Sequence, residues 1–207
     1  RWRRHFTNRR LELESSLREA RLKSLQYRMR PHFLFNTLNA IHSVLRRDAD
    51  RAGQAILMLA ENYRFLLEKS EGFLIPFLDE WSFTENYTRL EYMRFADRLE
   101  IKIEKEGDFA DVLIPPLTIQ PLAENAFVHG IRRLRGDGLI LIRAVRQEHE
   151  IEIIVEDNGP GFESPPSETR GTLWHIRQRM EHHFPWSAFE VRNRPEGGVR
   201  SSLRFDC

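Results

Sequence analysis

Apolar residues recur along positions 1–70 with the spacing of helices that each bury one face. The first two rows comprise Leu13, Leu17 and Ala20, then Leu22, Leu25 and Met29. A later row alternates intervals of four and three residues and comprises Ala52, Ile56, Leu59, Tyr63 and Leu66. That alternation is typical of a helix with one buried stripe. The polar stretch 46–50 between the rows predicts a helical hairpin turn, with Asp50 as the N-cap of the second helix.

The apolar period changes from helical to strand-like near residue 99. Before that point, Phe83, Tyr87 and Leu90 predict a helix over 77–97, whereas residues 99–104 alternate like a half-buried strand. The further predicted elements are strands at 139–145, 151–155, 189–194 and 199–205, and helices over 116–129 and 173–183. This order indicates an α+β fold with a mixed sheet and helices on one face.

The predicted hairpin needs a partner surface, because two helices alone cannot enclose a core. It can dimerise into a four-helix bundle, or it can pack on the C-terminal part of its own chain. We expect the dimer, since it is the more economical way to bury both apolar stripes. The sequence leaves both arrangements open.

Charge is divided unequally along the 207 residues, although 32 Lys and Arg against 31 Asp and Glu give a net charge of +1. Residues 1–30 hold ten basic and three acidic side chains, so this arm carries +7 and the remainder −6. Such an arm, with Trp2 near its start, suits the cytoplasmic flank of a membrane helix or a solvated helix end. We expect no direct nucleic-acid binding, because no aromatic platform or reader motif accompanies the basic residues.

Composition narrows the class of protein further. The single cysteine, Cys207, excludes a disulfide framework and favours a reducing compartment. No apolar run approaches the roughly 20 residues that span a bilayer. The chain begins at Arg1 rather than Met, so we expect it to be a piece of a longer protein, with any membrane segment preceding it.

Residues 30–36 place a proline and a histidine inside a helical pattern. In a helix interior Pro31 costs about 3 kcal/mol and frees the carbonyl of Tyr27, so a helix that only packs has little reason to carry it. Asn36 lies one turn after His32 on the same face and can orient the imidazole. A neutral imidazole nitrogen is a nucleophile toward phosphorus or carbon. Taken alone, such a histidine is more often a core or capping residue.

The segment 119–130 carries polar residues suited to a metal and a phosphate. Glu124, Asn125 and His129 fall within about a turn and a half of helix. Asn125 offers the oxygen that Mg²⁺ prefers, and His129 shares its face. Alone, this pattern is weaker evidence than a capped helix with surface polar residues.

A second polar segment, 157–161, directly follows a predicted strand. Asp157 stands at the strand end, where its carboxylate can accept a hydrogen bond from the exocyclic amine of adenine. Gly159 and Gly161 let the backbone approach a ligand closely. A turn that merely joins two elements explains the same residues in isolation.

Together these segments resemble a known family. Residues 25–41, LQYRMRPHFLFNTLNAI, are similar to the phosphoacceptor segment of LytS-type sensor histidine kinases, and the core PHFLFN stands complete at 31–36. Residues 124–130 and 157–161 match, in order, the N box and the G1 box of the GHKL-type ATPase domain of those kinases. The junction 94–99 also looks like theirs, and a GHKL chaperone or topoisomerase would lack the PHFLFN core.

The resemblance implies an α+β protein in which a helical hairpin forms a dimeric four-helix bundle and precedes a GHKL (Bergerat-type) α/β sandwich with a mixed sheet. Four parts are expected. They are a juxtamembrane or coiled-coil helix (1–21), a dimerisation and histidine phosphotransfer hairpin (22–75), a connecting helix (76–98) and an ATP-binding catalytic domain (99–207).

Carried over position by position, the resemblance makes His32 the acceptor of the γ-phosphoryl group of ATP, with Asn36 and Glu124 as further catalytic residues. It implies ATP and Mg²⁺, with Asn125 coordinating Mg²⁺ and Asp157 recognising adenine. The full nucleotide-binding set is Asn125, His129, Gly130, Asp157, Gly159, Gly161, Gly171, Thr172 and Leu173. Phe33 follows the histidine where many other histidine kinases place an acid, so the sequence does not name the proton acceptor.

The glycine-rich lid departs from the family pattern. Such kinases usually carry Gly-x-Gly-Leu-x-Asn before a helix that ends in Arg-Leu. Residues 170–180 read RGTLWHIRQRM, in which Leu173 and Arg179 fit this pattern. Arg170 and Thr172 replace the glycines, His175 replaces the asparagine, and Gly171 is one place out of register. Amides at this helix start still favour an anion, but we expect a stiffer lid and reduced nucleotide affinity or turnover.

The resemblance implies the kinase of a two-component system. ATP phosphorylates His32, and the phosphoryl group passes to an aspartate of a response regulator, which in this family often carries a LytTR-type DNA-binding domain. The chain is then a homodimer through its N-terminal helices and the cytoplasmic portion of a cell-membrane protein. The altered lid motivates an alternative, a degenerate kinase that binds nucleotide or scaffolds a partner without transfer.

A separate metal site built from His175, His182 and His183 is the weakest hypothesis. His182 and His183 are adjacent and therefore diverge on a helix, and no cysteine accompanies them. They suit a solvated helix end before Pro185 better.

Overall fold

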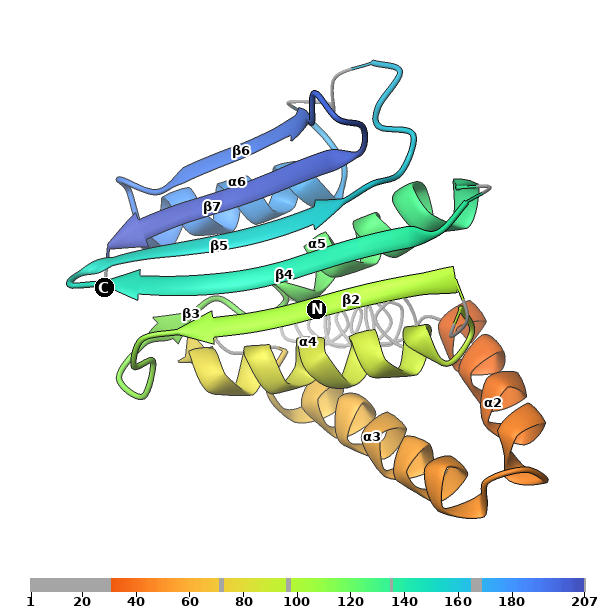
Figure 1. Ribbon diagram of the computed structural model, residues 1–207. Helices are drawn as coiled ribbons and strands as arrows, with labels where there is room; N and C mark the ends of the chain where they lie inside the picture. Colours follow the sequence, from red (N-terminus) through yellow and green to blue (C-terminus); the bar gives the residue numbers. More distant parts are fainter. Residues whose placement is uncertain (1–30, 71–72, 96–97, 135, 165–168, 207) are drawn as a thin grey trace, which may run out of the picture.

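The computed structural model describes residues 31–70, 73–95, 98–134, 136–164 and 169–206 (Figure 1). The predicted helix 1–21 and the expected kink at Tyr27 lie outside these residues, as do two positions of the junction 94–99. A helical hairpin comes first, built from α2 (Pro31–Leu45) and α3 (Ala49–Glu68), as predicted. No helix in the described ranges is both long and apolar enough to cross a membrane.

The N-cap of α3 is Asp48, so the prediction of Asp50 is wrong. The backbone of Asp48 is extended (φ −152°, ψ 90°), and its carboxylate accepts a hydrogen bond from the Arg51 N–H at 2.9 Å. Asp50 instead lies in the first turn of α3. There an acidic side chain interacts favourably with the positive end of the helix dipole.

The buried stripe of α3 is shifted from the predicted row. Ile56 is 51% exposed, and the residues that are buried are Ala52, Ala55, Leu59, Asn62 and Phe65. The helix α3 packs against α2 as well as against the next helix along the chain, so its buried positions are those that face these two helices rather than a single row. The stripe packs on α4 (Phe77–Tyr92), where the rings of Phe65 and Phe83 stack 4.2 Å apart. The hairpin therefore rests on its own chain, and the four-helix dimer stays a prediction.

The helix α4 connects the hairpin to the sheet. It buries Phe83, Tyr87 and Leu90, as predicted, but it ends at Tyr92, five residues earlier than expected. A small antiparallel pair of β1 (Ile75–Pro76) and β3 (Leu113–Ile114) anchors its start. Figure 1 shows α3 beneath α4, on the side away from the sheet.

Five strands form the main sheet, in the order β2-β4-β5-β7-β6 (Figure 1). They are β2 (Leu99–Glu106), β4 (Gly138–Gln147), β5 (Glu150–Asp157), β7 (Val199–Asp206) and β6 (Ala188–Asn193). The β2–β4 pair is parallel and the other pairs are antiparallel, so the predicted mixed sheet is confirmed.

Helices cover one face of this sheet and complete an α+β layer arrangement. They are α4, α5 (Gln120–Asn125) and α6 (Thr172–His183). The core between the layers includes Ile140, Ile142, Ile151, Ile153, Leu203 and Phe205 from the sheet. This apolar layer supports the ends of β5 and α5, where the predicted site residues lie.

The helix predicted over 116–129 begins later, at Gln120. Leu117 adopts a left-handed conformation (φ 58°), which an α-helix does not accommodate, so the chain turns before α5 starts. After Asn125 the helix widens into a π-helical turn, Ala126–Gly130, and ends as a 3₁₀ turn, Ile131–Arg133. Single π turns inside helices are frequent at functional sites.

Candidate functional site

A pocket lies at the C-terminal end of β5, against α5 and the π turn. The free space at the pocket is about 390 Å³ when the open solvent at its mouth is counted. Its lining comprises Leu122, Asn125, Ala126, His129, Gly130, Val155, Asp157, Gly161, Phe162, Leu173, Val199 and Ser201. Six of the predicted nucleotide-binding residues are thus brought together, namely Asn125, His129, Gly130, Asp157, Gly161 and Leu173.

Asp157 is the buried acid of the pocket, with only 4% of its surface exposed. Its Oδ1 accepts a hydrogen bond from the Gly159 N–H at 2.7 Å. Burial raises the pKa of the carboxyl from 3.8 to about 6, against the lowering effect of the Gly159 and Val199 N–H groups and of the Arg194 charge. At neutral pH the group is mainly ionised and is a strong hydrogen-bond acceptor.

Glycines let the N box and the G1 box meet at Asp157. A Cβ on Gly130 would lie 2.6 Å from Oδ1 of Asp157, and one on Gly159 would lie 2.3 Å from the Cα of Gly130. No side chain fits at either place, so these two glycines allow the boxes to pack backbone to backbone. Gly159 therefore lies behind the pocket wall and supports it. Its predicted role beside a ligand stays a prediction, since Gly159 is not among the lining residues.

The N-box side chains differ in their exposure. Asn125 is half-buried and lines the pocket, while His129 is exposed at its rim. Partial burial and the nearby Arg133 charge lower the pKa of His129, so the imidazole is neutral at pH 7 and can donate one hydrogen bond. Glu124 is half-buried and does not line the pocket.

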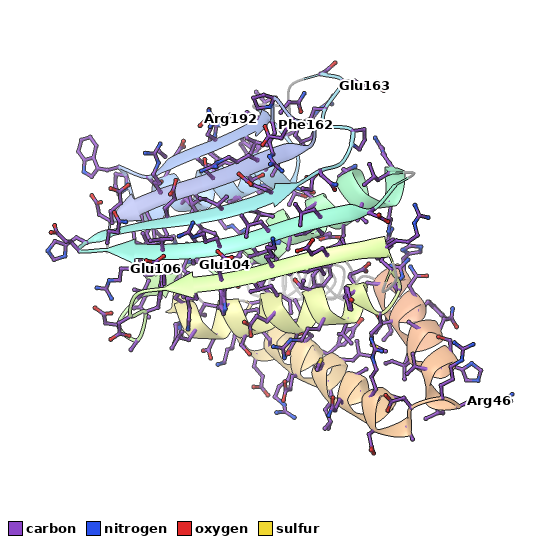
Figure 2. All side chains as sticks on the ribbon, in the orientation of Figure 1. Arg46, Glu104, Glu106, Phe162, Glu163 and Arg192 are labelled. Atoms are coloured by element: carbon purple, nitrogen blue, oxygen red, sulfur yellow. The ribbon has the colours of Figure 1, made fainter. Side chains whose placement is uncertain are left out.

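The lid residues contribute unequally. Gly171 (φ 96°) precedes α6 as its N-cap, and only the following Leu173 reaches the pocket, whereas Gly171 and Thr172 are exposed and do not line it. The loop after β5 is tied to the sheet because Asn193 exchanges two hydrogen bonds with the backbone of Phe162, at 2.8 and 2.9 Å. Figure 2 shows Phe162 and Glu163 in this loop, beside the end of β6.

The segment that resembles the phosphoacceptor lies on a different element. His32 is exposed in the first turn of α2, and the amide nitrogen of Asn36 lies 3.0 and 3.1 Å from its two ring nitrogens. Ring contacts connect this helix to the pocket segment through α4. Phe33 stacks on Tyr87 at 5.1 Å, and Tyr87 meets Phe127 of the π turn edge-on at 6.0 Å.

Several pocket residues were not predicted from the sequence, notably Phe162, Val199 and Ser201. The period-two pattern of the strand 199–205 held a signal for two of them, because Val199 and Ser201 alternate in register with the buried Leu203. Phe162 follows a glycine turn and left no comparable pattern.

The His, Cys, Asp and Glu residues of the described part of the chain do not gather into a metal-binding cluster. No group of three or more His, Cys, Asp or Glu residues there could hold a metal ion, so His175, His182 and His183 do not form a site. Asn125 is the pocket's candidate oxygen ligand for a cation that is also held by phosphates.

Comparisons with known proteins agree on one family. The family model described as histidine kinase matches residues 20–99. The sensor protein LytS of Oceanobacillus iheyensis is 34% identical over 152 residues, which are 73% of this chain and 26% of that protein. The putative uncharacterized protein YwpD of Bacillus subtilis is 34% identical over 189 residues, which are 86% of this chain and 67% of that protein. The chain thus spans about a quarter of the length of LytS.

Among solved structures, the histidine kinase domain of a blue-light activated histidine kinase from Erythrobacter litoralis is 18% identical, with a TM-score of 0.48. The alignment covers 89% of this chain and 92% of that one.

Proposed function

Since the chain belongs to the LytS-type sensor histidine kinases, we propose that the pocket at Asp157 binds ATP with Mg²⁺ and that His32 accepts the γ-phosphoryl group. In the proposed reaction the bond between the γ-phosphorus and the bridging oxygen of ADP breaks, and a bond from an imidazole nitrogen to that phosphorus forms. ADP leaves, and the proton of the imidazole passes to a base that the structure does not identify.

The observation that carries this proposal is the meeting of the two boxes at one buried carboxylate. Asp157 and Gly130 lie 27 positions apart in the chain, yet a Cβ on Gly130 would collide with the Asp157 carboxylate. An ionised acid in a largely apolar pocket matches the exocyclic amine of adenine, which donates a hydrogen bond. Leu122, Val155 and Leu173 offer apolar surface for the base.

The residues around Asn125 suit the phosphate end of the nucleotide. Its amide oxygen fits Mg²⁺, which would neutralise phosphate charge, and the neutral His129 at the rim can donate to a phosphate oxygen. Asn36 restrains the ring of His32, so the imidazole is held in one orientation on the exposed side of α2.

Incubation with γ-labelled ATP and Mg²⁺ tests the proposal. Acid-labile label is expected on the wild-type chain, and it should be lost in His32→Ala and strongly reduced in Asp157→Asn. His42→Ala is the matched control, because His42 is another exposed histidine of the same helix, and it should keep its label. Label that persists in His32→Ala would contradict the assigned acceptor.

A degenerate kinase is the second candidate function. The observation that favours it is the lid, because neither Gly171 nor Thr172 lines the pocket. Calorimetry that detects ATP binding, together with an absence of label on His32 under the same conditions, would establish this alternative.

The proposed kinase acts as a homodimer through its N-terminal helices. Large apolar side chains remain exposed on the described hairpin, at Phe35, Leu38, Leu45, Ile56, Leu57 and Leu67. Ile56→Glu should shift the sedimentation of the chain from dimer to monomer. Leu113→Glu is the control, because Leu113 is 48% exposed on β3, close to the 51% of Ile56, but lies outside the hairpin. An unchanged dimer in Ile56→Glu would place the interface elsewhere.

The remaining parts of the proposal follow from the family. The phosphoryl group of His32 is passed to an aspartate of a response regulator. Response regulators that carry a LytTR-type DNA-binding domain are among the proposed partners. The chain is proposed to be the cytoplasmic portion of a cell-membrane protein, attached through a segment N-terminal to Arg1.

A further inference from the structure

Glu80 is a fully buried carboxylate on α4 that bonds to backbone far away in the chain. Its Oε2 accepts from the Leu117 N–H at 2.8 Å, and its Oε1 accepts from Ile119 and Gln120 at 2.9 and 3.3 Å. The first N–H groups of a helix need external acceptors, and α5 receives none from its own N-cap, Ile119. Glu80 therefore caps the N-box helix from a different helix.

Arg179 of α6 holds the same loop from its carbonyl side. Its two terminal nitrogens donate to the carbonyl oxygens of Pro116 and Leu117, at 2.7 and 2.6 Å. The charge of Arg179 also acts on Glu80, where it counters the rise in pKa that burial causes. The loop before α5 is thus clamped between α4 and α6, the helix that begins directly after the lid glycine.

The clamp formed by Glu80 and Arg179 maintains a strained backbone at Leu117. Leu117 has φ 58°, a conformation that residues with a Cβ rarely adopt. Its N–H donates to Glu80, and its carbonyl oxygen accepts from Arg179. Such strain persists where the surroundings over-determine it, and it concentrates near functional sites. The start of α5 is therefore specified by side chains rather than by local sequence preference.

A second buried acid holds the other end of the N-box segment. Glu91 follows Glu80 by 11 positions, three helical turns, so both lie on one face of α4. Glu91 is 1% exposed, accepts two hydrogen bonds from Arg94 at 2.8 and 3.0 Å, and lies 3.8 Å from Arg132, just after the π turn. One face of α4 thus contacts the N-box segment before Asn125 and after it.

The loop before α5 requires an acceptor at position 80, because an apolar side chain there would leave the N–H groups of Leu117, Ile119 and Gln120 without this partner. Burying an ionised acceptor costs free energy that a neutral acceptor avoids. What the carboxylate adds is a fixed geometry for several backbone groups at once.

Resting on the proposed function, we infer that Glu80 and Arg179 are positioning residues for the Mg²⁺-bound phosphates. They fix α5, which carries Asn125, relative to α6, which follows the lid. The acid that would face adenine, Asp157, lies on β5 and accepts from the Gly159 N–H, a bond that does not involve the clamp. We therefore expect the clamp to affect recognition of the base less than binding of the phosphates, although α5 also carries Leu122.

Calorimetry of ADP binding to the full chain, in EDTA and then in Mg²⁺, separates the two ends of the nucleotide. Glu80→Gln keeps the shape but replaces one acceptor oxygen with a donor, and Arg179→Lys keeps the charge but loses the forked donor pair. In both variants we expect affinity in EDTA to stay within about twofold of wild type. We expect the gain in affinity on adding Mg²⁺ to fall about 10-fold, as for other residues that orient a metal ligand.

Two matched controls make the same chemical changes outside the clamp. Asp79→Asn alters the neighbouring acid of α4, which pairs with Lys69 of α3, and Arg177→Lys alters an arginine of α6 that donates to Phe189. Both should keep the wild-type gain on adding Mg²⁺.

The outcomes separate the clamp from the proposed function. All variants are compared at a temperature where circular dichroism shows them folded. If Glu80→Gln does not fold, the result for Arg179→Lys decides the test. A variant that melts earlier but keeps the full Mg²⁺ gain would reduce the clamp to a structural cap and overturn the inference. A wild-type chain that binds no ADP would instead refute the proposed function, and the inference with it.

Discussion

The helical hairpin and the proposed nucleotide pocket expose their key residues in opposite ways. His32 is solvent-exposed on a helix that also leaves large apolar side chains uncovered, whereas Asp157 is 4% exposed inside a packed α+β layer. In the proposed function His32 meets a phosphorus atom and then a second protein, which requires an accessible side chain. Asp157 would select the base, and burial strengthens its electrostatic interaction with a ligand while the buried charge opposes stability.

Asp157→Asn gives the largest expected effect, because it removes the buried charge. Nucleotide affinity should fall about 100-fold, as expected for a hydrogen bond to a charged acceptor. The free energy of unfolding at pH 7 should rise by about 1–3 kcal/mol, since the raised pKa shows that burial disfavours the ionised form. Calorimetry and urea unfolding of the same protein measure both changes.

His32→Ala provides the contrast for that prediction. An exposed side chain contributes little to stability, so the free energy of unfolding should stay within about 0.5 kcal/mol and nucleotide affinity should not change. Loss of stability in Asp157→Asn would show that this acid is a structural residue. The proposed contrast between an exposed reacting residue and a buried, destabilising binding residue would then be wrong.

Gly130→Ala tests the packing that lets the boxes meet. Its Cβ would lie 2.6 Å from Oδ1 of Asp157, so we expect the free energy of unfolding to drop by about 2 kcal/mol and the pocket to distort. Gly136→Ala is the control, because among the described residues nothing lies within 4 Å of its new Cβ, and stability should change by less than about 0.5 kcal/mol. Equal effects in chemical unfolding would refute the role of this contact.

The pH dependence of binding reports on the same carboxyl. At pH 5, one unit below its pKa of about 6, roughly a tenth of Asp157 is ionised, so nucleotide affinity should be about tenfold weaker than at pH 8. Because the folded pKa is raised above 3.8, the folded state binds this proton more tightly. The group's contribution to stability is therefore complete at low pH and is lost as pH rises through about 6.

Affinity and stability should therefore change in opposite directions between pH 7 and pH 5. Asp157→Asn removes the titrating carboxyl. The difference between the pH profiles of wild type and variant therefore reports on Asp157 alone and not on other groups. Parallel changes in wild type and variant would assign the pH dependence to another residue.

The sequence predicts most elements because their apolar periods are local. Strands over 139–145 and 151–155 lie within the observed β4 and β5, and buried positions alternate with partly buried ones along most of β4. The pocket was predictable as far as the family motifs extend, from Asn125 to Leu173. The family pattern also placed Gly171 and Thr172 beside the ligand, whereas in the structure only Leu173 of the lid segment lines the pocket.

What the sequence did not reveal depends on distant partners. Glu80 lies in a helix whose buried face is otherwise rich in aromatic and Thr residues, and the groups that donate to its carboxylate are backbone N–H groups 37 to 40 positions away. The conformation of Leu117 likewise follows from Glu80 and Arg179 rather than from its neighbours. An acid inside an apolar stripe was the available signal, and it indicates burial without naming the partner.

Asn36→Ala gives the smallest expected effect and tests the exposed side of the comparison. The amide restrains the ring of His32 by a single exposed hydrogen bond, worth about 1 kcal/mol, so the rate of label incorporation should fall about fivefold. Asn39→Ala removes another exposed amide of α2 and should leave the rate unchanged. Stability and nucleotide affinity should not change in either variant. A drop in nucleotide affinity in Asn36→Ala would mean that hairpin and pocket are coupled in binding, through the ring contacts of Phe33, Tyr87 and Phe127.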